Sequence, residues 1–165
     1  MKNNITYIGM DNGVSGSLGI ITPREVFYYH TPVKKVLNYT KTKKWLHRID
    51  GIKLKEILLS FKNAKVYIER PLVNPSRFQA TISAIRALEA TLIVLEDLGI
   101  PYEYCDSKGW QKLLLPSGLE KEELKEASLQ VAQRLFPKVN FEGFSDGDGL
   151  LIGEWARKIN TNIGE

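Results

Sequence analysis

Short apolar runs, broken by glycine and proline, make up the first part of the chain. Residues 5–10, 17–22 and 25–30 are rich in β-branched and aromatic side chains, and tight turns separate them. This arrangement predicts three strands in an antiparallel meander. Residues 32–48 follow without a clean period, and we expect them to form a surface loop or a mobile arm.

From residue 50 onward, helical and strand periods alternate. Asp50 is expected to cap a short helix, residues 64–69 to form a strand, and a long helix to run from about Ser76 to Leu98. A strand over residues 101–105 and further helices complete the pattern. Three strands followed by helices that alternate with two more strands predict one α/β domain over residues 1–165, with a five-stranded mixed sheet flanked by helices.

The long helix carries two stripes at helical spacing. The large apolar residues, which we expect to face the core, are Phe78, Ile82, Ile85, Leu92 and Leu95. The second stripe consists of the small residues Ala80, Ala84, Ala87 and Thr91. Because small side chains let another backbone approach closely, this stripe is a candidate homodimer contact, and burial inside the monomer is an equally good interpretation.

Composition excludes several classes of protein. The 165 residues are 43% hydrophobic, which is enough for a single core. One cysteine, Cys105, and two histidines exclude a disulfide scaffold and a structural zinc site. No apolar run reaches the ~18 residues of a membrane span, and no signal-peptide core is visible. We therefore expect a cytoplasmic protein without a membrane partner.

Positive charge is concentrated in the first half of the chain. Residues 24–70 carry twelve basic and four acidic side chains, a net charge of +8, whereas the remaining residues sum to −4. This asymmetry indicates a polyanionic partner. The candidate DNA contacts are Lys34, Lys35, Lys41, Lys43, Lys44, Arg48, Lys108 and Lys112.

Two acidic residues stand at the ends of predicted strands. Asp11 ends the first strand and Glu69 ends the strand over residues 64–69. If these strands are neighbours, their axes lie about 4.8 Å apart, and the two carboxylates meet at one edge of the sheet. Like charges that close need a cation or a proton. An ordinary ion pair between Glu69 and Arg70 is the simpler alternative.

Asp146 and Asp148 lie at the start of the last helix, predicted over residues 145–159. Asp148 shares a helical face with Trp155, so it is expected to point inward, where a carboxylate without a cationic partner favours metal ligation. Capping of the helix by its acidic first turn is the alternative. Asp146 can join Asp148 only if the helix has not yet begun at residue 146.

Carboxylate oxygens without a histidine cluster favour Mg²⁺ over zinc, and Mn²⁺ is expected to substitute for it. Two such ions can activate a water and stabilise the leaving oxygen of a phosphodiester. Together with the basic segment, Asp11, Glu69, Asp146 and Asp148 predict a metal-dependent nuclease, in which these four residues are both the metal ligands and the catalytic residues.

The same motifs resemble those of RuvC-type Holliday-junction resolvases. The resemblance rests on Asp11-Asn12-Gly13, on Ile68-Glu69, and on residues 108–112 and 146–152. The compact length is similar to the phage-encoded branch of that family, close to the enzyme of lactococcal phages. The resemblance implies a ribonuclease-H-like fold and a homodimer that uses divalent metal to cut four-way DNA junctions, and other branched DNA as a further substrate, in the host cytoplasm if the protein is phage-encoded.

The resemblance also implies roles for single residues. Asp11 matches the family's first-strand aspartate, Glu69 its second-strand glutamate and Asp148 its last aspartate. Gly149 stands where the family usually has alanine. The penultimate acid of the family lies three or four residues before the last one, so Asp146 is a displaced substitute.

Two other functions stay open at this point. Residues 11–16 also resemble the first phosphate loop of actin-like ATPases and phosphotransferases, although those folds usually need two domains and a second glycine-rich loop. The other alternative is a non-catalytic DNA-binding module, in which the acidic residues merely cap helices and form ion pairs.

Overall fold

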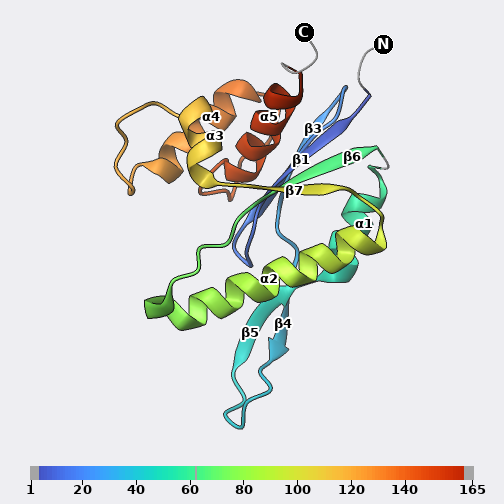
Figure 1. The fold of residues 1–165 in the computed structure, drawn as a ribbon, viewed down its shortest axis with the longest axis vertical. Coiled ribbons are helices and arrows are strands. Elements are labelled where there is room, and N and C mark those ends of the chain that lie inside the picture. The colour runs from blue at the N-terminus through green and yellow to red at the C-terminus, as the bar shows by residue number, and fades with distance from the viewer. Residues whose placement is uncertain (1–3, 62, 162–165) are drawn as a thin grey trace.

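The computed structural model describes residues 4–61 and 63–161, and its centre is a five-stranded mixed sheet (Figure 1). The strands run in the order β3-β2-β1-β6-β7. β2 is antiparallel to both β3 and β1, whereas β6 and β7 continue the sheet parallel to β1. The meander and the mixed sheet are therefore confirmed. The bounds are β1 (Thr6–Asp11), β2 (Ser17–Ile21), β3 (Val26–His30), β6 (Ala64–Glu69) and β7 (Tyr102–Cys105).

Helices cover both faces of this sheet (Figure 1). One face packs against α1 and α2, and the other against α5 with α3 and α4 beside it. Asp50 caps α1 as expected, because its side chain accepts a hydrogen bond from the Lys53 N–H. The helices are α1 (Gly51–Leu59), the 3₁₀ turn η1 (Pro75–Arg77), α2 (Phe78–Asp97), α3 (Ser107–Leu114), α4 (Leu124–Leu135) and α5 (Asp148–Thr161).

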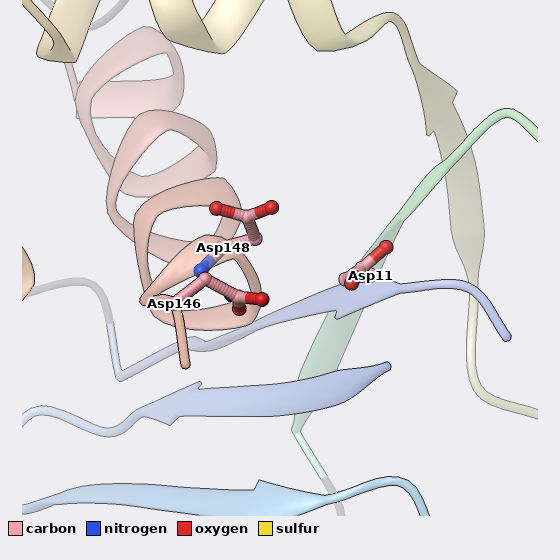
Figure 2. Close-up of side chains that lie close together, drawn as sticks. All are labelled: Asp11, Asp146 and Asp148. Atoms are coloured by element: carbon pink, nitrogen blue, oxygen red, sulfur yellow. Dashed lines mark hydrogen bonds between the residues drawn. The ribbon is translucent and has the colours of Figure 1, made fainter. Parts of the chain in front are cut away.

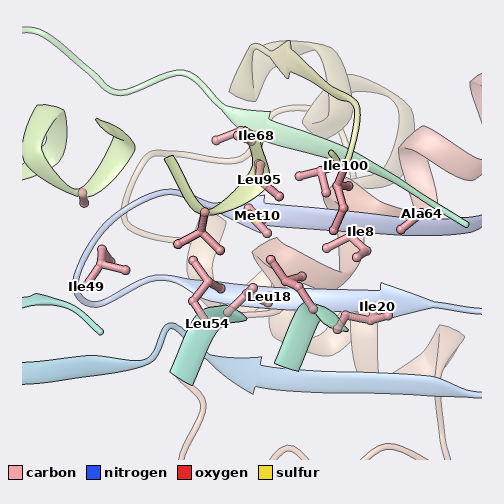
Figure 3. Close-up of a cluster of buried hydrophobic side chains, with 14 residues drawn as sticks. Ile8, Met10, Leu18, Ile20, Ile49, Leu54, Ala64, Ile68, Leu95 and Ile100 are labelled. Atoms are coloured by element: carbon pink, nitrogen blue, oxygen red, sulfur yellow. The ribbon is translucent and has the colours of Figure 1, made fainter. Parts of the chain in front are cut away.

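The alternation of side chains along β1 supplies both hydrophobic cores. Ile8 and Met10 are buried on the α1–α2 side, where they join Leu54 and Leu95 (Figure 3). Tyr7 belongs to the second core, on the side of α5. Because β1 is buried on both faces, the residue at its end is held in a fixed position relative to both helical layers.

Glycines bring α5 against the backbone of the sheet. A Cβ atom at Gly9 of β1 would lie 2.2 Å from the backbone nitrogen of Gly153 in α5. A Cβ atom at Gly149 would lie 2.8 Å from the carbonyl oxygen of Ser17. Position 149 therefore cannot accept a larger side chain without a shift of the helix. This close contact sets the first turn of α5 beside the end of β1.

Residues 32–48 are not a loop. β4 (Val33–Leu37) and β5 (Trp45–Ile49) form a separate antiparallel two-stranded sheet, which projects past α2 at the bottom of Figure 1. The predicted position at the surface is confirmed, but the predicted absence of regular secondary structure is wrong for this segment. Only Ile49 of the two strands is buried, so both faces of the hairpin carry polar residues and the sequence lacks the alternation of a half-buried strand.

The long helix is confirmed, and the predicted core stripe is right for its second half, where Leu95 is buried and Leu92 packs against the core, but wrong for Phe78 and Ile85. Ala87 and Thr91 are buried against the core, whereas Phe78 is 64% exposed and Ile85 is also exposed. The small side chains allow α2 to lie close to its neighbours. Burial in the monomer therefore accounts for the second half of the small stripe, while Ala80 in the first half remains exposed.

By length and composition alone, the segment Pro75–Asp97 is apolar enough to cross a membrane. Core helices of soluble proteins meet the same criterion. In this fold, the segment packs beside α1, and Val94 and Leu95 lie in the first core.

Candidate metal centre

Three elements bring acidic residues to one edge of the sheet. β1 and β6 are parallel neighbours, so Asp11 and Glu69 stand at their adjacent carboxyl ends. α5 begins at Asp148, and Asp146 precedes it. The condition for Asp146 to join Asp148 is therefore met, because the helix has not started at residue 146.

Asp11, Asp146 and Asp148 form a compact cluster (Figure 2). Each contributes one carboxylate oxygen, and these oxygens all lie within 4.8 Å of one another. Figure 2 shows Asp11 at the end of β1, with Asp146 and Asp148 at the base of α5. The spacing is short enough for the three side chains to share one cation.

Glu69 lies next to this cluster but is not part of it. Its carboxylate oxygen accepts a hydrogen bond of 2.7 Å from the indole Nε1 of Trp110 in α3. Trp110 is only 1% exposed, so this hydrogen bond is shielded from water. The structure thus groups three of the four predicted ligands, and Trp110 holds the fourth at their side.

The cluster is electrostatically strained. The pKa of Asp11 is raised to about 8, chiefly by burial and then by the negative charges of Asp148, Glu69 and Asp146. Burial also raises the pKa of Asp148 to about 6 and, to a smaller extent, that of Glu69. Hydrogen bonding by Trp110 opposes the shift at Glu69. A bound cation would relieve this mutual repulsion.

The residues of the cluster fit a divalent metal ion. The Oδ1 atom of Asp148 is buried and has no hydrogen-bond partner among residues 4–61 and 63–161. The ammonium of Lys125 reaches Asp146 at 3.5 Å, but its side chain is 70% exposed, so this pair neutralises little. Hard oxygen donors of this kind suit Mg²⁺ or Mn²⁺.

Aromatic residues support the loop that carries Asp146. The Tyr28 hydroxyl on β3 lies 3.0 Å from the Asp146 carbonyl and donates to it. Phe144 stacks on both Tyr28 and His30, with ring centroids 4.1 and 3.9 Å apart. The N–H of Asp148 donates to Asp146 Oδ1 at 3.3 Å. Asp146 therefore binds an N–H of the first turn of α5 and belongs to the acidic cluster at once, whereas the capping alternative from the sequence concerned Asp148.

The simpler alternative for Glu69 is not what the structure shows. Arg70 pairs with Asp106 instead, with Nε 3.1 Å from the carboxylate oxygen. The guanidinium also lies over the ring of Tyr104, 5.6 Å from its centroid. Arg70 thus forms its ion pair with Asp106 and not with Glu69.

An open groove of roughly 1050 Å³ begins at Asp11 and Glu69. It runs between the start of α2 and α3, and its walls carry Arg70, Arg77 and Lys108. Of the two predicted DNA contacts on α3, Lys108 lines this groove and Lys112 does not. The other six predicted contacts lie on or beside the β4–β5 hairpin, outside the groove.

Residues 108–112 were singled out by the resemblance, but sequence reasoning missed the role of Trp110 as the hydrogen-bond donor to Glu69, and it missed the stacked aromatic residues. Trp110 is 41 residues from Glu69, and its helix has no sequence signal that points to the strand end. Tyr28 is 118 residues from Asp146. A buried tryptophan or tyrosine usually needs a hydrogen-bond partner for its N–H or O–H group. The sequence therefore indicates that a partner exists, but it does not identify the partner.

The sheet order and the helices on both faces define a ribonuclease-H-like α/β fold, which confirms the predicted fold class. Among solved structures, the chain is similar to RuvC of T. thermophilus in complex with a Holliday-junction substrate. That structure is 14% identical with a TM-score of 0.64, and the match covers 97% of this chain and 96% of the other. A second T. thermophilus RuvC structure matches with a TM-score of 0.57 over the same shares, also at 14% identity.

No family model matches the sequence, and no curated protein matches it. At 14% identity the likeness to RuvC shows the fold alone. The phage-encoded type stays a prediction from the sequence.

Proposed function

We propose that this protein is a metal-dependent endonuclease that resolves four-way DNA junctions by hydrolysing phosphodiester bonds. The observation that carries the proposal is the convergence of Asp11, Asp146 and Asp148, with Asp11 also lining a groove to which Arg70, Arg77 and Lys108 contribute. The choice of substrate is supported by the similar fold of a RuvC bound to a Holliday junction. Other branched DNA, such as forks, is a second substrate to be tested.

Asp11, Asp146 and Asp148 would hold one metal ion, and Glu69 beside them would contact a second one. When bound, Mg²⁺ supplies a water of lowered pKa and stabilises the charge on the leaving oxygen. Without a cation, the raised pKa of Asp11 keeps this carboxyl largely protonated at neutral pH. The site is therefore built to bind positive charge, and the hydrogen bond from Trp110 keeps Glu69 oriented toward it.

The walls of the groove would bind the DNA backbone. Arg70, Arg77 and Lys108 offer guanidinium and ammonium groups to phosphates on either side of the carboxylates. Phosphate contacts orient the duplex without selecting its sequence. Their position at the carboxyl edge of the sheet would place a scissile phosphate beside Asp11.

A homodimer formed through α2 is part of the proposal. Resolution of a four-way junction needs two cuts, and this chain provides one acidic cluster within the part that the structure describes. The exposed side of α2 and the segment before it carry large apolar residues, which favour an interface between two copies. These residues are Leu72, Val73, Phe78, Ile85 and Ile93.

The direct test compares cleavage of matched linear, forked and four-way DNA with Mg²⁺, with Mn²⁺ and with a chelator. We expect paired cuts in the four-way junction that depend on metal and are absent with the chelator. Equal cutting of linear duplex would refute structure selectivity. Binding without metal-dependent cutting would favour the non-catalytic DNA-binding module, and nucleotide hydrolysis would favour the actin-like alternative.

A further inference from the structure

The β4–β5 hairpin has an unbalanced charge that the metal centre does not explain. Residues 33–49 include six lysines and arginines and no acidic residue. Within the two described stretches of the chain, no carboxylate forms an ion pair with any of these six side chains. The hairpin therefore carries a net charge of +6 that nothing in the described protein neutralises.

The pairing of the two strands makes this charge costly. Lys34 lies directly opposite Arg48 on the ladder. Like charges in directly opposite positions destabilise a pair of strands. A two-stranded sheet is at best marginally stable by itself, and here only Ile49 is buried in the core. A bound polyanion would neutralise these positive charges and so remove the repulsion between the strands.

The outer half of the hairpin also exposes apolar surface. Leu37 pairs with Trp45 across the strands, and Trp45 is 62% exposed. Tyr39 follows at the tip with 86% of its surface exposed. The guanidinium of Arg86 on α2 lies 5.8 Å from the centroid of the Tyr39 ring. Flat aromatic side chains among lysines suit a ligand that combines phosphates with the faces of bases.

We propose that the β4–β5 hairpin is a DNA-binding arm that recognises the branch point, and this inference rests on the proposed function. The lysines bind backbone phosphates, and Trp45 and Tyr39 stack on bases that are unpaired or unstacked where the strands exchange. A continuous duplex keeps its bases stacked, so the aromatic contacts are available only in branched DNA. A second copy of the chain is a poorer occupant, because it presents a hairpin of the same charge.

The test measures binding of a four-way junction and of a linear duplex of the same length, in Ca²⁺ or chelator so that no cutting occurs. We expect Trp45→Ala to weaken junction binding about tenfold and to leave duplex binding unchanged. Trp45→Phe, which retains an aromatic face, should keep most of the affinity. Leu135→Ala, which removes an exposed apolar side chain of α4, is the matched control and should change neither.

A second measurement separates the charges from the aromatic residues. The double variant Lys41→Ala and Lys43→Ala should lower the slope of log affinity against log salt, on both DNAs, by about 0.9 for each phosphate that the protein no longer neutralises. Lys138→Ala, an exposed lysine outside the hairpin, should leave the slope unchanged. Fluorescence of Trp45 should fall on addition of the junction, and Trp45→Phe should remove that change.

Three outcomes would overturn the inference: no loss of affinity with Trp45→Ala, an equal loss on both DNAs, or a change of oligomeric state in the Trp45→Ala variant on size-exclusion chromatography. The last result would assign the hairpin to contacts between copies. Cleavage by the wild-type protein is measured in parallel. If the wild type cuts junctions while Trp45→Ala behaves like the wild type, the hairpin inference fails and the proposed function stands.

Discussion

The acidic edge of the sheet and the β4–β5 hairpin both accumulate charge of one sign, but they do so in opposite surroundings. Asp11, Asp146 and Asp148 are held within 4.8 Å by close packing, and burial raises the pKa of two of them. The hairpin lysines stand in water, where repulsion is screened. Buried like charges select one small cation at a fixed place, whereas exposed like charges select an extended polyanion with little constraint on geometry.

The largest expected effect comes from removing a buried carboxylate. Asp11→Asn should reduce metal-dependent cleavage of a four-way junction by at least about a thousandfold, because it removes a metal ligand. Junction binding should stay equal or become stronger, since negative charge near the phosphate is removed. Lys34→Ala in the hairpin should show the reverse pattern, with weaker binding and nearly normal cleavage at saturating DNA. Asp97→Asn, an exposed carboxylate on α2, is the control. Parallel loss of binding and cleavage with Asp11→Asn would contradict the ligand assignment.

Stability without metal should fall as the pH rises. The pKa of Asp11 is about 8 in the folded protein, against an ordinary value of 3.8, so the folded state holds its proton more tightly than the unfolded state does. The free energy of unfolding should therefore decrease between about pH 4 and pH 8, by about 1.4 kcal/mol for each unit of pKa shift as an upper bound. Urea unfolding in chelator measures this. Asp11→Asn should flatten the dependence, and saturating Mg²⁺ should reduce it. If the difference in the free energy of unfolding between the two proteins does not depend on pH, the raised pKa of Asp11 is contradicted.

Close packing of α5 should be the next most sensitive feature. Gly9→Ala places a Cβ atom 2.2 Å from the backbone of Gly153, so we expect a loss of about 2–3 kcal/mol in the free energy of unfolding. Gly109→Ala in α3 is the matched control, since its nearest neighbour to an added Cβ is 4.0 Å away. Thermal and chemical unfolding of both variants provide the measurement. Equal stability of the two would show that the helix can move away from the sheet at little cost.

Trp110→Phe should weaken metal binding about tenfold while leaving the fold intact. The substitution keeps the aromatic ring in the core and removes the indole N–H that orients Glu69. Calorimetric titration with Mn²⁺ or Ca²⁺, in the absence of DNA, measures the affinity directly. Trp155→Phe is the control, because that indole packs beside Tyr67 and is not hydrogen-bonded to Glu69. An unchanged affinity in Trp110→Phe would make the hydrogen bond to Glu69 purely structural.

The smallest effect is expected at Lys125, whose exposed side chain reaches Asp146 at 3.5 Å. Lys125→Ala should change the free energy of unfolding by less than about 1 kcal/mol, as is usual for exposed ion pairs. The affinity for Mn²⁺ should rise slightly, because a competing positive charge is removed. Calorimetric titration with Mn²⁺ shows whether the affinity rises or falls. A large loss of affinity would mean that Lys125 organises the cluster rather than merely touching it.

The strands of the sheet could be predicted because their apolar residues are bounded by clear turn signals. The ends of β1 and β6 were predictable for the same reason, and with them the positions of Asp11 and Glu69. The hairpin was not predictable from alternation, since both of its faces are largely exposed. The buried side of α2 was predicted correctly at Leu95 and wrongly at Phe78 and Ile85, because the helix lies so close to its neighbours that small residues such as Ala87 and Thr91 also fill the contact. That distance is a property of the assembled fold.

The site itself could be predicted only as a set of carboxylates. Which of them converge depends on where α5 starts and on the direction of each side chain. Asp146 joins the cluster because the helix begins two residues later. Glu69 stands apart because the buried indole of Trp110 binds it. Neither fact has a local signal in the sequence, since both arise from contacts between segments distant along the chain.

The glycine contacts between α5 and the sheet have a consequence for how such a site can change during evolution. The main chain at Gly9 and Gly149 touches its neighbours directly, so the frame around the carboxylates has almost no room to expand or tilt. If a metal-binding carboxylate is lost from one position, the helix cannot move to compensate. An acidic residue elsewhere on the loop before α5 can replace it more easily. Asp146, which lies on the loop before α5 and not on the helix itself, is an acidic residue in such a position.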